Sequence, residues 1–145
     1  MSTLTTNPSE AKFTPYVPAK DEEYMSDAQL EHFKAILLDW KSQLIGEADR
    51  TKTYIQDESS AMPDINDRAT QEEEFALALR TRDRERKLIR KIDKSMSEIE
   101  NDDYGFCETC GVEIGLRRLE ARPTATQCID CKTLSEIKER QNQGA

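Results

Sequence analysis

Four cysteines, arranged as two pairs, constrain this chain more than any other feature of its sequence. Cys107 and Cys110 form the first pair and Cys128 and Cys131 the second, in the pattern C-x2-C-x17-C-x2-C. This spacing is typical of a zinc site, because two intervening residues let one tight turn direct both sulfurs at one ion. Four protein ligands leave no coordination position for a substrate. The sequence therefore predicts one structural, non-catalytic zinc ion.

A thiol-redox pair is the alternative interpretation of a C-x-x-C motif. Such a pair is expected at the start of a helix that follows a strand, and the sequence shows this setting at neither pair. The segment 104–132 is short and holds few large apolar side chains, so we expect it to need the metal in order to fold. These features favour a small four-cysteine zinc-ribbon module at 104–132.

Residues 26–103 carry the hydrophobic spacing of a long coiled-coil hairpin. Apolar residues recur at alternating steps of three and four, which is the spacing of a coiled-coil seam. In the first half they are Leu30, Phe33, Leu37, Trp40 and Leu44, and in the second Phe75, Ala78, Ile89, Ile92, Met96 and Ile99. Two long helices joined by a short turn fold back antiparallel to bury such stripes.

The ends of the two helices follow from capping and breaking residues. Ser26 is a suitable N-cap with Gln29 in the capping-box position, and the first helix is expected to reach Ser59. Pro63 then disfavours helix at the residue before it. The second helix is expected to run from about Ala69 to about Asn101. The tip of the hairpin therefore falls near 61–69.

The seam is uneven along its length. Large apolar residues occupy the half near the chain ends, whereas Thr51, Arg82 and Glu85 lie at or beside seam positions near the turn. We therefore expect the half of the hairpin next to the tip to be the less stable one.

The remaining segments are short and polar. Residues 1–25 form an N-terminal arm, and 133–145 form a C-terminal helix over Thr133 to Gln141 followed by a tail. His32, the only histidine, has no ligand-type neighbours at suitable spacing and is expected to be exposed. No stretch has the length of a membrane span or of a signal-peptide core, so a cytoplasmic location is expected. The fold class is mainly α.

Charge argues against several classes of function. The chain has a net charge of −8, whereas proteins that grip a nucleic-acid backbone on their own carry an excess of Lys and Arg. Direct, sequence-specific DNA binding is therefore disfavoured. No Ser/His/Asp, Cys/His or phosphate-loop arrangement occurs in the sequence, so we predict that the protein is not an enzyme.

Two charged features allow both a structural and a functional interpretation. Asp64 and Asp67 at the hairpin turn are ordinary turn and cap residues, or an acidic tip that probes a basic or metal-containing cavity about 50 Å from the other end. A stripe at helical spacing, Arg80, Arg84, Lys87 and Lys91, is a solvated face paired with neighbouring acids. Alternatively it is an anion site, completed by basic residues of the zinc module such as Arg117, Arg118, Arg122 or Lys132.

Three segments resemble the DksA/TraR family of bacterial transcription factors. They are RATQEEEF at 68–75, RDRERKLI at 82–89 and YGFCETCGVEIGLRRLEARP at 104–123. The similarity covers about residues 20–140, and it is closer in the second helix and the zinc module than in the first helix and arm. All four cysteines of the family's zinc site are retained.

The resemblance implies a monomeric regulator that binds RNA polymerase and inserts its coiled coil into the secondary channel. The functional tip would be Asp64, Asp67 and Ala69. Guanosine tetraphosphate (ppGpp) would bind at the interface with polymerase, at the positions Arg84, Leu88, Lys91, Arg122 and Lys132. Such a factor destabilises open promoter complexes in the stringent response, represses ribosomal RNA promoters and activates some biosynthetic promoters.

Three rival functions remain open on the sequence. A Gre-type transcript-cleavage factor also inserts an acidic coiled coil into polymerase, although the zinc module that follows the hairpin argues against it. A zinc-thiol redox switch would lose zinc on mild oxidation. A plain adaptor would use the coiled coil as a docking surface, and its function would not depend on Asp64 or Asp67.

Overall fold

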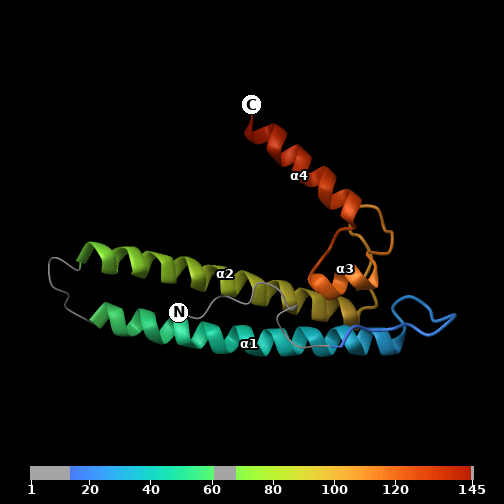
Figure 1. Cartoon of the computed structure of the whole chain (residues 1–145), viewed down its shortest axis with the longest axis horizontal. Coiled ribbons are helices and arrows are strands. Elements are labelled where there is room, and N and C mark those ends of the chain that lie inside the picture. Colours follow the sequence, from blue (N-terminus) through green and yellow to red (C-terminus); the bar gives the residue numbers. More distant parts are fainter. Residues whose placement is uncertain (1–13, 61–67, 145) are drawn as a thin grey trace.

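Two long antiparallel helices dominate the computed structural model, which describes residues 14–60 and 68–144 (Figure 1). Helix α1 spans Asp27–Ser60 and helix α2 spans Arg68–Glu100. Both predicted helices are confirmed, with each end within one residue of the expected position. At a rise of 1.5 Å per residue, each helix is about 50 Å long.

The first turn of α1 is capped by side chains, as the sequence predicted. The Gln29 N–H donates to Ser26 Oγ at 3.3 Å, which satisfies one of the free donors at the helix start. The Gln29 side chain reaches back and accepts from the Met25 N–H at 2.7 Å. This return bond goes to the residue before the N-cap, whereas an ordinary capping box returns to the N-cap itself.

The hydrophobic core lies where the hairpin meets the zinc module. Its α1 residues are Phe33, Ile36, Leu37, Trp40 and Leu44, and its α2 residues are Ile92 and Ile99. Tyr104, Ile114 and Leu119 of the zinc module complete it. The predicted seam is thus buried at this end of the hairpin. Toward the tip the seam becomes polar, since Glu85 is 1% exposed and is hydrogen-bonded to Thr51 across the helices at 2.9 Å.

A short helix that the sequence did not reveal lies in the zinc module. Helix α3 spans Leu116–Ala121 and begins after Gly115, whose φ of 104° is accessible mainly to glycine. It lies over the end of the hairpin (Figure 1). Leu119, at 0% exposure, is its contribution to the core. Gly111, Gly115 and Pro123 are residues typical of turns, and they surround this segment. For that reason the sequence did not indicate a helix here.

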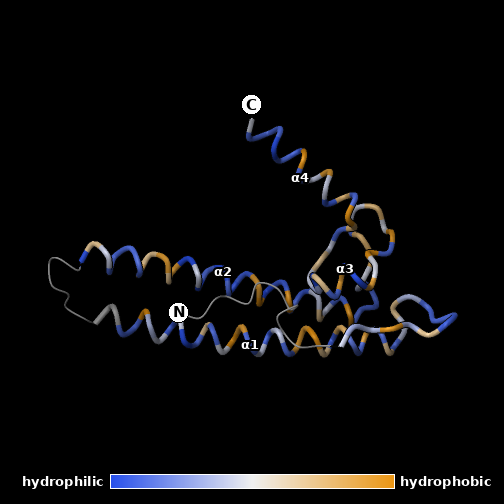
Figure 2. The backbone as a smooth tube through the Cα atoms, in the orientation of Figure 1, coloured by the Kyte–Doolittle hydropathy of each residue, from blue (hydrophilic) through white to orange (hydrophobic). Residues whose placement is uncertain are grey.

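The C-terminal helix α4 spans Ile129–Gln143 and therefore begins before the predicted Thr133. Its N-cap is Cys128, whose sulfur accepts a bond from the Cys131 N–H at 3.5 Å. The prediction was wrong because it treated the second cysteine pair as loop. Helix α4 points away from the hairpin and is largely hydrophilic (Figure 2).

Regular β structure is nearly absent from the described part of the chain. The β pairing found there is an antiparallel bridge between Phe106 and Glu113. The predicted zinc ribbon therefore contains no longer strand in the described residues. Among the described residues, no helix combines the length and the apolar character that crossing a membrane requires.

Candidate functional site

The four cysteines, Cys107, Cys110, Cys128 and Cys131, form one compact cluster. Their sulfur atoms all lie within 4.8 Å of one another, and the Sγ atoms of Cys110 and Cys128 are 3.7 Å apart. Sulfurs at the corners of a tetrahedron with zinc–sulfur bonds of about 2.3 Å are about 3.8 Å apart. The cluster therefore has the dimensions of a four-cysteine zinc site.

The thiols of the cluster differ in acidity because of the hydrogen bonds around them. Hydrogen bonding with the sulfurs of Cys128 and Cys110 raises the pKa of Cys131 to about 12. The backbone N–H of Cys128 lowers the pKa of Cys107 to about 6. A zinc ion at the centre would bind all four sulfurs as thiolates, and the distances between the sulfurs allow this. The cluster holds one structural zinc ion, as predicted.

The two cysteine pairs are presented by different local structures. The first pair lies on a tight turn in which the Gly111 N–H donates to the Cys107 carbonyl at 2.9 Å, and Gly111 has a φ of 79°. The second pair lies at the start of α4. The expectation that neither pair begins a helix was therefore wrong for the second pair. No strand leads into that helix within the described residues, so the redox setting is still incomplete.

The hydroxyls of two tyrosines form hydrogen bonds to the zinc module: Tyr24 joins it to the N-terminal arm, and Tyr104 lies within the module itself. The Tyr24 hydroxyl donates to the Gly105 carbonyl at 2.8 Å and accepts from the Gly115 N–H at 3.0 Å. The Tyr104 hydroxyl, buried in the core, donates to the Pro123 carbonyl at 2.7 Å. Sequence reasoning missed both roles, because neither tyrosine has a local pattern that points to its distant bond.

A buried carboxylate on α3 contacts both the N-terminal arm and α1. Glu120, 5% exposed, accepts a hydrogen bond from the Tyr16 N–H at 2.9 Å and lies 3.3 Å from His32 Nε2. His32 also contacts the rings of Tyr16 and Phe33. The prediction that His32 is exposed was wrong, because the side chain is partly buried against Glu120. Glu120 is 88 residues away in the sequence, so local patterns could not reveal this contact. These contacts fix the orientation of the zinc module on the hairpin.

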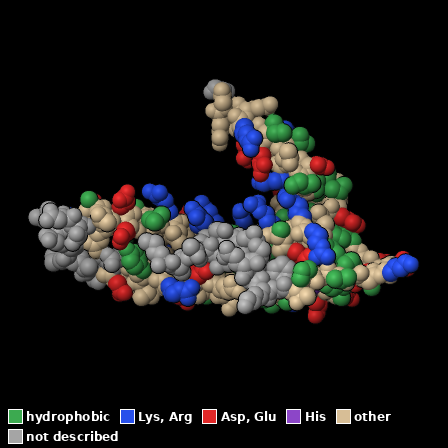
Figure 3. Space-filling model, viewed as in Figure 1, with side chains coloured by type: hydrophobic (Ala, Val, Ile, Leu, Met, Phe, Trp, Pro, Cys, Tyr) green, Lys and Arg blue, Asp and Glu red, His purple; other side chains and the backbone are tan. Residues whose placement is uncertain are grey.

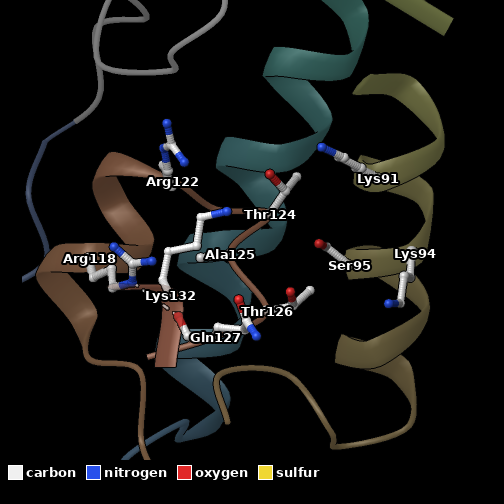
Figure 4. A pocket seen from close by; sticks show the side chains of 10 residues that line it. All are labelled: Lys91, Lys94, Ser95, Arg118, Arg122, Thr124, Ala125, Thr126, Gln127 and Lys132. Atoms are coloured by element: carbon white, nitrogen blue, oxygen red, sulfur yellow. Dashed lines mark hydrogen bonds between the residues drawn. The ribbon is translucent and has the colours of Figure 1, made fainter. Parts of the chain in front are cut away.

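A cavity of about 260 Å³ lies between α2 and the zinc module. Its lining residues come from α2, α3, the segment 122–127 and α4, and basic side chains lie on both sides of it (Figure 4). They are Lys91, Lys94, Ser95, Arg118, Arg122, Thr124, Ala125, Thr126, Gln127 and Lys132. Lys and Arg side chains gather in the same concave corner between α2 and α4 in the space-filling view (Figure 3).

Three of the ligand-binding residues that the family resemblance implied lie together at this cavity. Lys91, Arg122 and Lys132 all line it, and within the described residues none of the three forms an ion pair. Two further cations are engaged: Lys94 lies 3.9 Å from Glu108, and Arg118 Nε donates to the Gln127 carbonyl at 3.1 Å. Lys91 is exposed and Lys87 of the same stripe pairs with Asp83, so the solvated-face and anion-site interpretations both stay predictions.

The other site residues of the resemblance lie outside the cavity. Arg84 is exposed on α2, and Leu88 packs on the edge of the core. Neither lines the cavity, although both lie on α2 within two turns of Lys91. At the tip, Ala69 is exposed in the first turn of α2. Asp64 and Asp67 lie outside the described residues.

Comparison with known proteins identifies the family to which this chain belongs. Residues 29–99 match the family model described as the N-terminal domain of DnaK suppressor protein DksA. Residues 102–136 match the model of the prokaryotic dksA/traR C4-type zinc finger. The chain therefore belongs to the DksA/TraR family.

Individual relatives agree over most of the chain. The proteins of Salmonella typhimurium and Escherichia coli K12 named RNA polymerase-binding transcription factor DksA are each 62% identical over 130 residues. These matches cover 90% of this chain and 86% of each relative. The solved structure of transcription factor DksA2 from Pseudomonas aeruginosa is similar with a TM-score of 0.76 and 36% identity, covering 83% of this chain and 94% of the other. These relatives are named as transcription factors, in agreement with the prediction that the chain is not an enzyme.

Proposed function

We propose that this chain is a cytoplasmic, monomeric transcription factor that binds RNA polymerase and inserts its hairpin into the secondary channel. The names of its relatives and the family match over both the hairpin and the zinc module support this proposal. A pair of helices about 50 Å long suits entry into a narrow channel. Asp64, Asp67 and Ala69 would then approach the catalytic region of polymerase, and the protein would not contact promoter DNA directly.

In this proposal the zinc module sets the direction of insertion. It contacts the hairpin through the Glu120 carboxylate near His32 and the Tyr104 ring against Phe33, and it contacts the arm through the Tyr24 hydroxyl. Bound zinc stabilises the turn that these residues contact. The metal thus acts on transcription only through the orientation of the hairpin, and it takes no part in chemistry.

The nucleotide ppGpp would bind at Arg84, Leu88, Lys91, Arg122 and Lys132, between this protein and polymerase. The observation that carries this part is the cavity in which Lys91, Arg122 and Lys132 converge without carboxylate partners among the described residues. Unpaired cations in a concave site, in a chain whose net charge is −8, favour a ligand of high negative charge. Arg84 and Leu88 would face the same ligand from farther along α2.

Binding would destabilise the open promoter complex. Promoters with short-lived open complexes, such as those of ribosomal RNA, would be repressed in the stringent response, and some biosynthetic promoters would be activated. Because the nucleotide bridges the two proteins, it would tighten the binding of this protein to polymerase. The binding of this protein would in turn tighten the nucleotide by the same factor.

Transcription in vitro from a ribosomal RNA promoter tests the proposal. Purified bacterial polymerase is mixed with this protein, with and without ppGpp. We expect inhibition that deepens when the nucleotide is added. Lys91→Ala should raise the nucleotide concentration for half-maximal effect about tenfold or more, since it removes a charge-assisted contact.

Lys87→Ala is the matched control for Lys91→Ala. Lys87 lies on the same face of α2 but is paired with Asp83 at 3.0 Å and does not line the cavity. It should leave the nucleotide response unchanged. Absence of any inhibition by the folded, zinc-bound protein would refute the proposal. Cleavage of the transcript in stalled complexes would point instead to a Gre-type factor.

A further inference from the structure

One end of the anion cavity is lined by hydroxyl groups that no other group of the described structure uses. Ser95 projects from α2 toward the segment 122–127 (Figure 4), and Thr124 lines the cavity from that segment. Ser95 is 2% exposed. Its hydroxyl has no hydrogen-bond partner within residues 14–60 and 68–144, and the same holds for the hydroxyl of Thr124. Among the described residues, Glu85 Oε2 is the buried side-chain atom without a partner, so the Ser95 oxygen is still accessible from the cavity that it lines.

The neighbouring polar groups of the cavity are already engaged. The Thr126 hydroxyl lies 3.4 Å from Glu108 Oε1. The Gln127 amide nitrogen lies 3.1 Å from the Thr109 hydroxyl and 3.4 Å from that of Ser135. These bonds hold the segment 122–127 against the cysteine turn and α4. Among the neutral side chains of the cavity, Ser95 and Thr124 are therefore the ones available to a ligand.

We propose that the hydroxyls of Ser95 and Thr124 donate hydrogen bonds to a phosphate group of the nucleotide bound in this cavity. The inference rests on the proposed function and deepens it, because it adds two residues that determine which anion fits. Phosphate oxygens only accept hydrogen bonds, so they match a hydroxyl whose own acceptor is missing. A bond from a hydroxyl to an ionised oxygen is also stronger than a neutral one.

In this proposal the basic residues of the cavity provide most of the affinity, and the hydroxyl residues provide selectivity among anions. Lys91, Arg122 and Lys132 line the cavity and attract any strong anion, whereas the hydroxyls of Ser95 and Thr124 add donors of defined direction. A phosphate that reached the Ser95 hydroxyl would be removed from water, and there each hydrogen bond contributes more to affinity.

Substitution of Ser95 by alanine tests the inference. Ser95→Ala keeps every charge of the cavity, and it should favour helix formation because alanine has the higher helix propensity. In the transcription assay we expect the concentration of ppGpp for half-maximal effect to rise roughly tenfold, the usual consequence of losing one hydrogen bond to a charged group. The thermal midpoint should not fall. Thr124→Val should act in the same direction.

Two control variants separate a ligand contact from a structural role. Ser97→Ala removes a hydroxyl from an exposed position of α2 and should leave the nucleotide response unchanged. Ser95→Thr keeps the hydroxyl and should retain most of the response. If Ser95→Ala and Thr124→Val respond like the unsubstituted protein while Lys91→Ala does not, the inference is overturned and the proposed function stands. If the unsubstituted protein shows no response to the nucleotide, both are overturned.

Discussion

Replacement of Glu85 by glutamine should stabilise the hairpin at neutral pH. Glu85 is 1% exposed in the polar part of the seam, and its Oε2 has no hydrogen-bond partner within the described residues. Its Oε1 accepts a bond from the Thr51 hydroxyl, which also lies 3.0 Å from the Glu47 carbonyl. That single hydroxyl hydrogen is shared, so Glu85 is only weakly compensated for its burial.

The size of the effect follows from these contacts. A buried acceptor without a partner costs about 1–3 kcal/mol, and more when it is charged. Glutamine keeps an acceptor for Thr51 and removes the charge, but it introduces an amide that also needs a partner. We therefore expect a net gain of about 1 kcal/mol in the free energy of unfolding. For a chain of this size that corresponds to a rise of about 2–4 °C in the thermal midpoint.

The gain should depend on pH in a defined direction. Burial raises the pKa of Glu85 above its ordinary value of 4.5; the Thr51 hydrogen bond lowers it, the Glu47 carboxylate raises it, and the Arg50 guanidinium lowers it. Because the pKa is raised in the folded state, the favourable contribution of Glu85 is complete below pH 4.5 and is lost as the pH rises through the folded-state pKa. The advantage of Glu85→Gln should therefore grow from acid to neutral pH.

Urea unfolding and amide hydrogen exchange between about pH 5 and 8, where the zinc ligands stay bound, measure this effect. Protection of the α1 amides around Thr51 should increase in Glu85→Gln. Glu73→Gln, at an exposed position of α2, is the control and should show neither effect. A Glu85→Gln protein that is less stable at neutral pH would refute the reasoning, because Glu85 would then make a net favourable ionic contact. Equal protection at both ends of the unsubstituted hairpin would refute the predicted softness near the tip.

Four further predictions concern the zinc module and the tip. Gly105→Ala should cost about 1–2 kcal/mol in urea unfolding, because Gly105 has a φ of 95° and an added Cβ would lie 2.9 Å from the Met25 side chain; unchanged stability would contradict this. Tyr104→Phe should cost about 1–3 kcal/mol in the same assay through loss of the bond to Pro123, and a neutral result would mean that water replaces the hydroxyl. Removal of zinc by a chelator should broaden the NMR signals of the zinc module and leave those of the hairpin helices sharp; unchanged spectra would show that the metal is dispensable for folding. Asp67→Asn should weaken transcriptional inhibition without weakening polymerase binding measured by competition, and full inhibition would favour the adaptor hypothesis.

Local chemistry in the sequence determined the two long helices and the metal site. The seam from Phe33 to Leu44 follows the period of a helix, and that period is a property of the local chain. Ser26 marks the helix start because capping involves only its neighbours. The cysteine spacing indicated zinc for a similar reason, since each pair needs only one tight turn to face an ion.

Only the tertiary structure decided how the zinc module sits on the hairpin. The pairing of His32 with Glu120 joins residues far apart in the sequence, and no local sequence pattern indicates it. The same packing brings Lys91 and Lys132 to one cavity and turns the Ser95 hydroxyl into it. A helical stripe of charge has the same spacing whether it faces solvent or a second module. Its role is therefore determined by the element packed against it, which depends on contacts distant in the chain.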